Sequence, residues 1–243
     1  MPAVFVHGVP ETHHLWDGVR QHLSRKDIIA PDMPGFGSDV PAGFGSTKEE
    51  YLDWLVAEVE NVGEPVDVVG HDWGALLVAR LVSTRSDLVR TWAIGGGAID
   101  EGYTWHQIAQ VWQTPSMGEQ FMAGFAPEQI VLALVAEGVP EEAAKDAASR
   151  IDDRMKASIL PLYRSAVNYM KEWGPDVDRI DKPGMLIWGE KDPYMQIEFA
   201  KRMAQRAGAE LVALPGSHWW PLQFPKEAAG ALERLWARSG QSS

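Results

Sequence analysis

The sequence predicts an α/β protein with a mostly parallel central sheet flanked by helices. Six short apolar runs, rich in Val and Ile, alternate with longer segments of helical pattern, and each run ends close to a Gly or a Pro. Continuous apolar strands bounded in this way are typical of a parallel sheet that helices cover on both faces. The strand signal is missing over residues 100–173, which are rich in helix formers, so we expect a helical insertion there.

The elements follow one another in the order that such a fold requires. The expected strands are Val4–Val6, Asp27–Ala30, Val66–Val69, Thr91–Ile94, Met185–Trp188 and Glu210–Leu214. A helix should begin at Thr47, because Glu50 three residues later completes a capping-box pattern. Two further helices are expected, one from just after Gly74 to about Val82 and one from about Lys226 onward. We therefore assign residues 1–99 and 174–243 to an α/β core, and residues 100–173 to a helical cap inserted after the strand that ends near Gly95.

Composition excludes several classes of protein. The 243 residues contain no cysteine, which rules out a disulfide scaffold, a thiolate zinc site and a cysteine nucleophile. A formal net charge of −12 argues against nucleic acid or an anionic membrane as a partner, since both bind basic surfaces. We find no transmembrane run and no signal-peptide pattern, so we expect a cytoplasmic protein, either a monomer or a homodimer, without metal or cofactor.

The most informative motif lies between the third expected strand and the helix after it. Gly70-His71-Asp72-Trp73-Gly74 has the strand–turn–helix layout of a nucleophile elbow, with aspartate where serine is common. The flanking glycines fit a turn at which strand and helix approach closely. The alternative is an ordinary turn whose aspartate caps the helix.

Two other residues complete a catalytic triad in the order nucleophile, acid, histidine. Asp192 follows the fifth expected strand and His218 follows the sixth, so all three side chains should reach one edge of the sheet. The loop His7–Pro10 follows the first strand, and its Val9 N–H could pair with the Trp73 N–H as an oxyanion hole. The alternative for this loop is a simple turn.

An aspartate nucleophile limits the reaction class. When a carboxylate attacks a saturated carbon it forms an ester, which water can hydrolyse, whereas a serine would form a stable ether. The carboxylate is already ionised at neutral pH and needs no base. Asp72 therefore suits displacement at a saturated carbon, with His218 activating water for the second step and Asp192 orienting His218.

Five motifs of the chain resemble those of α/β-hydrolases, and they span nearly its whole length. They are His7–Glu11, Asp32–Ser38, Gly70–Gly74, Gly189–Pro193 and Gly216–Trp219. Aspartate at the elbow is shared by epoxide hydrolases and haloalkane dehalogenases, and His-Gly-x-Pro-Glu with His-Asp-Trp-Gly looks more like the epoxide hydrolases.

That resemblance implies two cap residues that donate a proton to the epoxide oxygen. Tyr163 matches the second cap tyrosine, with packing in the cap core as the alternative. For the first donor the chain offers His106 or, less well placed, Tyr103. The expected reaction converts a small apolar epoxide and water to a vicinal diol, because aromatic residues of the insertion predict an apolar pocket.

Two alternatives stay open. A haloalkane dehalogenase would use the Trp73 indole as a halide donor; Val9 stands where such enzymes commonly have an asparagine donor, although Trp105 or Trp112 could replace it. The other alternative is a non-catalytic, ligand-binding homologue. The complete set Asp72, Asp192 and His218 argues against this second alternative.

Overall fold

The computed structural model describes residues 1–240; the last residues of the expected core, 241–243, lie outside the described part. Its centre is one six-stranded sheet with the order β2-β1-β3-β4-β5-β6, in which every neighbouring pair is parallel. The strands are β1 (Ala3–Val6), β2 (Ile28–Ile29), β3 (Val66–His71), β4 (Val89–Gly95), β5 (Gly184–Gly189) and β6 (Glu210–Leu214). All six strands lie where the apolar runs predicted them, which confirms the α/β class.

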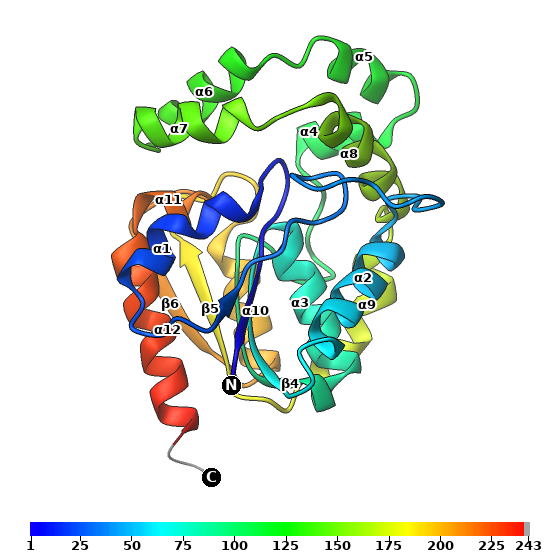
Figure 1. Cartoon of the computed structure of the whole chain (residues 1–243). Coiled ribbons are helices and arrows are strands. Elements are labelled where there is room, and N and C mark those ends of the chain that lie inside the picture. Colours follow the sequence, from blue (N-terminus) through cyan, green and yellow to red (C-terminus); the bar gives the residue numbers. More distant parts are fainter. Residues whose placement is uncertain (241–243) are drawn as a thin grey trace.

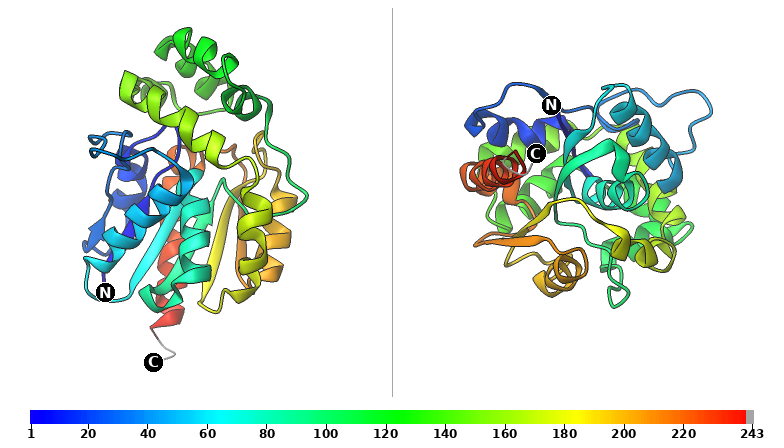
Figure 2. Two further views of the ribbon diagram at one scale, coloured as in Figure 1. Left: turned by 90° about the vertical axis from the view of Figure 1, so that its right-hand side faces the viewer. Right: turned by 90° about the horizontal axis from the view of Figure 1, so that it is seen from below.

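Helices cover both faces of this sheet (Figure 2). On one face Val68 and Trp92 pack with residues of α2, α3 and α10, and on the other Phe5 and Val69 pack with residues of α1 and α12. Successive residues of a strand point to opposite faces, so apolar residues are needed at every position of such a strand. The helices of the two layers, with the short helices that join them, are α1 (Asp17–His22), α2 (Lys48–Glu60), α3 (Trp73–Thr84), α10 (Ile197–Arg206), α11 (Trp220–Gln223) and α12 (Pro225–Ser239), with the 3-10 turns η1 (His13–Trp16), η2 (Ser86–Leu88) and η3 (Gly174–Arg179).

The segment between β4 and β5 is helical throughout its regular structure. It contains α4 (Gln107–Gln113), α5 (Met117–Ala123), α6 (Pro127–Ala136), α7 (Glu141–Ser149), α8 (Asp153–Ser165) and α9 (Tyr169–Trp173). Helices α4 to α8 lie beyond the carboxyl ends of the strands, above the sheet in Figure 1. Helix α9 instead lies beside α2, where Glu172 pairs with Lys48 at 2.7 Å. The end of the segment therefore belongs to the layer that flanks the sheet.

The boundaries of two elements differ from the prediction. The strand expected over Asp27–Ala30 is reduced to the two residues of β2, which lies at the edge of the sheet and pairs with β1 alone. Helix α3 begins at Trp73, before Gly74, because the turn of the elbow is completed by Asp72 alone. The capping box at Thr47 and Glu50 forms as predicted, with Thr47 accepting from the Glu50 N–H. Among residues 1–240, no helix has the length and apolar character that crossing a membrane requires.

Candidate active site

Asp72 is the single residue that connects β3 to α3. Its backbone has φ 51° and ψ −118°, a conformation that non-glycine residues rarely adopt and that is associated with functional sites. Its carbonyl oxygen already accepts from the Ala75 and Leu76 N–H groups, but its side chain makes no capping hydrogen bond to the helix. The carboxylate is therefore available for other partners, which argues against a simple capping role.

The two glycines of the elbow are required by close packing. A Cβ atom on Gly70 would lie 2.4 Å from the Gly74 carbonyl oxygen, and one on Gly74 would lie 2.2 Å from the Val6 carbonyl oxygen. Both distances are far below van der Waals contact. The elbow thus holds Asp72 at the carboxyl edge of the sheet by bringing three backbone segments together.

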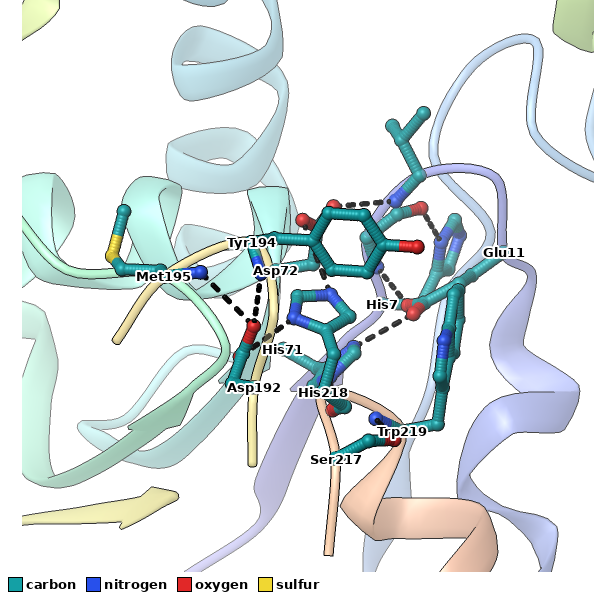
Figure 3. A network of polar contacts seen from close by, with 12 residues as sticks. His7, Glu11, His71, Asp72, Asp192, Tyr194, Met195, Ser217, His218 and Trp219 are labelled. Carbon is teal, nitrogen blue, oxygen red and sulfur yellow. Dashed lines mark hydrogen bonds and ion pairs between the residues drawn. The ribbon is translucent and has the colours of Figure 1, made fainter. Parts of the chain in front are cut away.

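The structure brings Asp72, Asp192 and His218 together at that edge (Figure 3). His218 Nδ1 lies 2.9 Å from Asp192 Oδ2, and His218 Nε2 lies 3.5 Å from Asp72 Oδ2. The other oxygen of Asp192 accepts the N–H groups of Tyr194 at 2.8 Å and Met195 at 3.0 Å. Asp192 is thereby fixed, and its bond to Nδ1 directs Nε2 toward Asp72.

The second oxygen of Asp72 is held by the loop after β1. The Val9 N–H donates to Asp72 Oδ1 at 2.8 Å, which leaves Oδ2 as the oxygen that faces His218. The Trp73 N–H opens α3 in the same turn, but the contacts among residues 1–240 include no hydrogen bond from it to this carboxylate. Of the two expected oxyanion donors, only Val9 therefore contacts the carboxylate in the described part of the chain.

The charges of these three residues are coupled. Burial by itself lowers the pKa of His218, but the nearby Asp192 and Asp72 carboxylates outweigh burial and raise it well above 6.5. Burial raises the pKa of Asp72, and the hydrogen bond and charge of His218 reverse this, so that the pKa falls below 3.8. The charged forms of Asp72 and His218 therefore stabilise each other.

A second buried network supports the backbone of His218, and its members had no predicted role. Glu11 accepts the Gly8 N–H at 2.5 Å and pairs with His71 Nδ1 at 2.7 Å, while His71 Nε2 donates to the His218 carbonyl oxygen at 2.9 Å (Figure 3). Glu11, His71 and His218 offer ligand atoms within 4.8 Å of one another, but these protein contacts already use Glu11 and His71. Glu11 lies in the motif after β1 and His71 in the motif at the end of β3, and only the fold brings them together.

Comparison with known proteins places this fold and site in a family. The sequence profile of the alpha/beta hydrolase family matches residues 3–231. The chain belongs to this family. Its curated relatives are distant, and they differ in the reactions for which they are named.

Three relatives illustrate this spread. The chain is 22% identical to the (E)-2-((N-methylformamido)methylene)succinate hydrolase of Acinetobacter baylyi, over 96% of this chain and 89% of the relative. It is 26% identical to epoxide hydrolase 3 of Mus musculus, over 92% and 67%. It is 24% identical to a haloalkane dehalogenase of Psychrobacter cryohalolentis, over 79% and 67%.

Solved structures show the same fold. An esterase from Thermogutta terrifontis superposes with a TM-score of 0.81 at 17% identity, covering 98% of this chain and 90% of the other. A haloalkane dehalogenase loop variant from Bradyrhizobium elkanii gives a TM-score of 0.77 at 20% identity, covering 98% and 91%. The chain thus has the α/β-hydrolase fold, and the reaction has to be argued from its own residues.

In this α/β hydrolase, Asp72 and His218 open into a cavity of about 220 Å³ beneath the helical segment. Tyr163 of α8 and His106 at the start of α4 line the same cavity. Most of the remaining lining is apolar or aromatic: Val9, Pro10, Ile108, Trp112, Phe121, Phe125, Ile130, Ala133, Leu134 and Trp219. Most of the site residues predicted from the sequence therefore gather around one cavity.

Burial shifts the pKa values of the two expected proton donors, Tyr163 and His106, in opposite directions. Burial and the Asp72 charge raise the pKa of Tyr163 well above 10, so its hydroxyl keeps its proton. Burial lowers the pKa of His106 to about 4, so its ring is neutral at pH 7. Because His106 Nδ1 accepts the Ala109 N–H at 3.3 Å, the ring proton resides on Nε2. Tyr103 lines a smaller neighbouring cavity of about 20 Å³ with Trp73.

The tryptophans considered as halide donors also differ. Trp112 has a buried indole N–H without a hydrogen-bond partner among the described residues, whereas the Trp73 side chain interacts with the Tyr163 hydroxyl. Both rings contact Tyr163, with centroid distances of 5.3 Å for Trp73 and 4.8 Å for Trp112. The Trp105 indole donates to the Ala166 carbonyl oxygen at 3.3 Å, so it is already engaged.

Proposed function

We propose that this α/β hydrolase converts an epoxide to a vicinal diol through an alkyl ester on Asp72, with helices α4 to α8 of the inserted segment acting as its cap. The proposal rests mainly on which side chains line the cavity. A carboxylate nucleophile and a histidine lie at its sheet edge, and a protonated tyrosine and a neutral histidine line it from the helical segment. Displacement at an epoxide carbon needs this combination of nucleophile and acid.

The first step uses the oxygen of Asp72 that is not held by Val9. Oδ2 attacks an epoxide carbon, the carbon–oxygen bond breaks, and the ring oxygen takes the Tyr163 hydroxyl proton. The neutral His106 donates a second hydrogen bond from Nε2 to that oxygen. The product is a hydroxyalkyl ester of Asp72 with a phenolate at Tyr163.

The proton held by His218 then restores the tyrosine. Esterification removes the Asp72 charge, one of the causes that keep the His218 pKa high, so His218 gives up its proton more readily. Transfer of this proton to the Tyr163 phenolate leaves a neutral His218 beside the ester. The first step thus generates the base that the second step needs.

Hydrolysis of the ester completes the cycle. Neutral His218 takes a proton from water, the hydroxide attacks the Asp72 carboxyl carbon, and the Val9 N–H stabilises the oxyanion, a contact worth about 3 kcal/mol in comparable sites. The intermediate collapses to the diol, whose leaving oxygen takes the proton from His218. Asp72 then loses its proton to His218, which restores the starting charges.

One observation favours a second candidate, haloalkane dehalogenation. Trp73 and Trp112 line the cavities that contain Asp72, and the buried Trp112 indole N–H has no partner among the described residues. Halide departure requires such hydrogen-bond donors and no proton transfer. The nucleophile, base and ester chemistry would be the same. The two reactions differ in whether the Tyr163 proton is needed.

The experiment that separates the candidates is trapping of the ester. In a His218→Gln variant the ester forms and persists, so intact-protein mass reports each productive substrate. We expect adducts of epoxide mass on Asp72 from an epoxide panel and none from a haloalkane panel. Adducts from haloalkanes alone would transfer the assignment to a dehalogenase. No adduct from either broad panel would favour the non-catalytic homologue. Asp72→Asn in the same background is the matched control and should give no adduct.

A further inference from the structure

Glu137 brings a second carboxyl group to the active-site cavity. It follows α6 directly and lines the same cavity as Asp72. The Tyr194 hydroxyl donates to Glu137 Oε1 at 2.6 Å. Glu137 Oε2 is buried, and besides the Tyr194 hydroxyl the Trp219 side chain interacts with this carboxyl group. Keeping a partly buried carboxylate ionised is unfavourable, and a positively charged ligand would stabilise it.

The surroundings of Glu137 compensate its charge only in part, because burial raises the pKa of its carboxyl group more than the Tyr194 hydroxyl and the charge of His218 lower it. It lies at the carboxyl end of α6, where the helix dipole disfavours a negative group. No lysine or arginine is among the described residues that line the cavity. Lys191 borders a separate surface groove together with Glu137, and the ion pairs within residues 1–240 include none between them. No lysine or arginine of the described cavity lining therefore balances the charge of Glu137, and a cationic ligand in the cavity would do so.

The rest of the cavity is suited to a cation as well as to apolar groups. Six aromatic side chains line it: Trp112, Phe121, Phe125, Tyr163, Tyr194 and Trp219. The Trp219 side chain interacts with the Glu137 carboxyl group and lowers its pKa, and the Tyr194 hydroxyl donates a hydrogen bond to it. Faces of aromatic rings attract ammonium groups, and quaternary ammonium ligands are recognised by such aromatic surroundings.

We propose that Glu137, with Trp219 and Tyr194 beside it, binds an ammonium group of the substrate. The substrate class is then an epoxide with an apolar body and a protonated or quaternary amine. The reaction in this statement rests on the proposed function, whereas the cation site does not. The net charge of −12 favours cationic ligands further, because it raises their concentration near the protein.

The test is equilibrium binding of two probes that differ only in charge. Choline carries a trimethylammonium group, and 3,3-dimethylbutan-1-ol replaces its nitrogen by carbon. We expect the wild-type protein to bind choline at least about tenfold more tightly in calorimetric titration. Equal affinities in the wild type would overturn the proposal, and this comparison needs no variant.

Variants of Glu137 test whether this residue causes the preference for choline. Glu137→Gln keeps an acceptor for the Tyr194 hydroxyl but removes the charge, so the preference should fall to about twofold or less. Glu128→Gln makes the same change at an exposed position of α6 outside the cavity and should leave the preference for choline unchanged. Glu137→Asp retains the charge and should keep part of the preference. A Glu137→Gln protein with the full preference would contradict the assignment to this residue.

The binding comparison and the ester-trapping experiment test different claims, so either can fail without the other. A choline preference without adducts in the His218→Gln protein would refute the proposed reaction and leave the cation site. Epoxide adducts together with equal affinities for choline and 3,3-dimethylbutan-1-ol would refute the cation site and leave the proposed reaction. If both hold, an epoxide with a trimethylammonium group should be favoured in kcat/KM over its tert-butyl analogue, and Glu137→Gln should reduce that ratio by about tenfold.

Discussion

His218 Nε2 lies 3.5 Å from Asp72 Oδ2, so the proposed base and the proposed nucleophile stabilise each other's charged forms. The carboxylates raise the pKa of His218 well above 6.5, and the imidazolium lowers the pKa of Asp72. In the free protein both carboxylates therefore favour the protonated form of His218. Loss of the Asp72 charge in the ester lowers the pKa of His218, which couples the two half-reactions.

Replacing Asp192 by Asn should slow ester hydrolysis much more than ester formation. Asp192 is the first of the groups that raise the His218 pKa, and it orients the ring. We expect the decay of the ester to slow by about 10²–10⁴-fold, as for loss of the triad acid elsewhere. Decay requires neutral His218, so its rate rises with pH through the His218 pKa, and in the variant this rise should move to lower pH. Rapid quench with intact mass measures both effects.

The control for this change is Asp178→Asn, which alters an exposed carboxylate paired with Arg206 at 2.9 Å. It should leave ester decay within about twofold, since surface ion pairs contribute little. Unchanged ester decay in the Asp192→Asn protein would argue that another group orients His218.

Tyr163→Phe should slow formation of the ester from epoxides by about 10²–10⁴-fold, the usual contribution of a general acid. Its hydroxyl is buried and keeps its proton, because burial and Asp72 raise its pKa. Single-turnover ester formation in the His218→Gln background measures the effect. Tyr169→Phe is the matched control, since the Tyr169 hydroxyl bonds to the Ala98 carbonyl oxygen at 3.4 Å and does not line the larger cavity. Equal slowing by both variants would argue against acid catalysis by Tyr163.

The strands and the order of the triad could be predicted because their signals are local. An apolar run that ends at Gly or Pro marks a buried strand wherever it packs, and Asp192 and His218 each follow such a run. The capping box of Thr47 and Glu50 is likewise encoded within four residues. Parallel strands bring their carboxyl ends to one edge, so these local signals sufficed to place the three side chains together.

The contacts that the sequence did not reveal join distant segments. Glu137 and Tyr194 are 57 residues apart, and His71 and the His218 carbonyl are 147 residues apart. Whether such groups meet depends on how the helical segment and the loops pack, which periodicity does not encode. The same reason explains α9, whose Tyr169, Met170 and Trp173 are buried in the core that α2 and α3 share.

Asp67→Ala should destabilise the protein strongly without changing the site. Asp67 is fully buried in β3, where it accepts from Arg25 at 2.7 Å and from Thr91 at 2.6 Å and also pairs with Arg90. Removing one partner of a buried ionic network leaves uncompensated charges and typically costs about 3–5 kcal/mol. Urea unfolding measures this loss. Asp27→Ala, at an exposed partner of Arg25, should cost less than about 1 kcal/mol. Equal losses in the two variants would mean that burial of Asp67 is not what makes its network important.

Asp72→Gly and Asp72→Asn should both abolish ester formation, yet differ in stability. Both remove the carboxylate charge, but only glycine adopts φ 51° and ψ −118° without strain. We expect the Asp72→Gly variant to be about 1 kcal/mol more stable than the Asp72→Asn variant in urea unfolding, because relief of strain exceeds the greater chain entropy of glycine. At Asp153, in the first turn of α8, the same two substitutions should show the reverse order, since the helical backbone there favours asparagine over glycine. Equal stability of the two Asp72 variants would show that the elbow stores no such strain, and the position of the nucleophile would then rest on the packing of Gly70 and Gly74 alone.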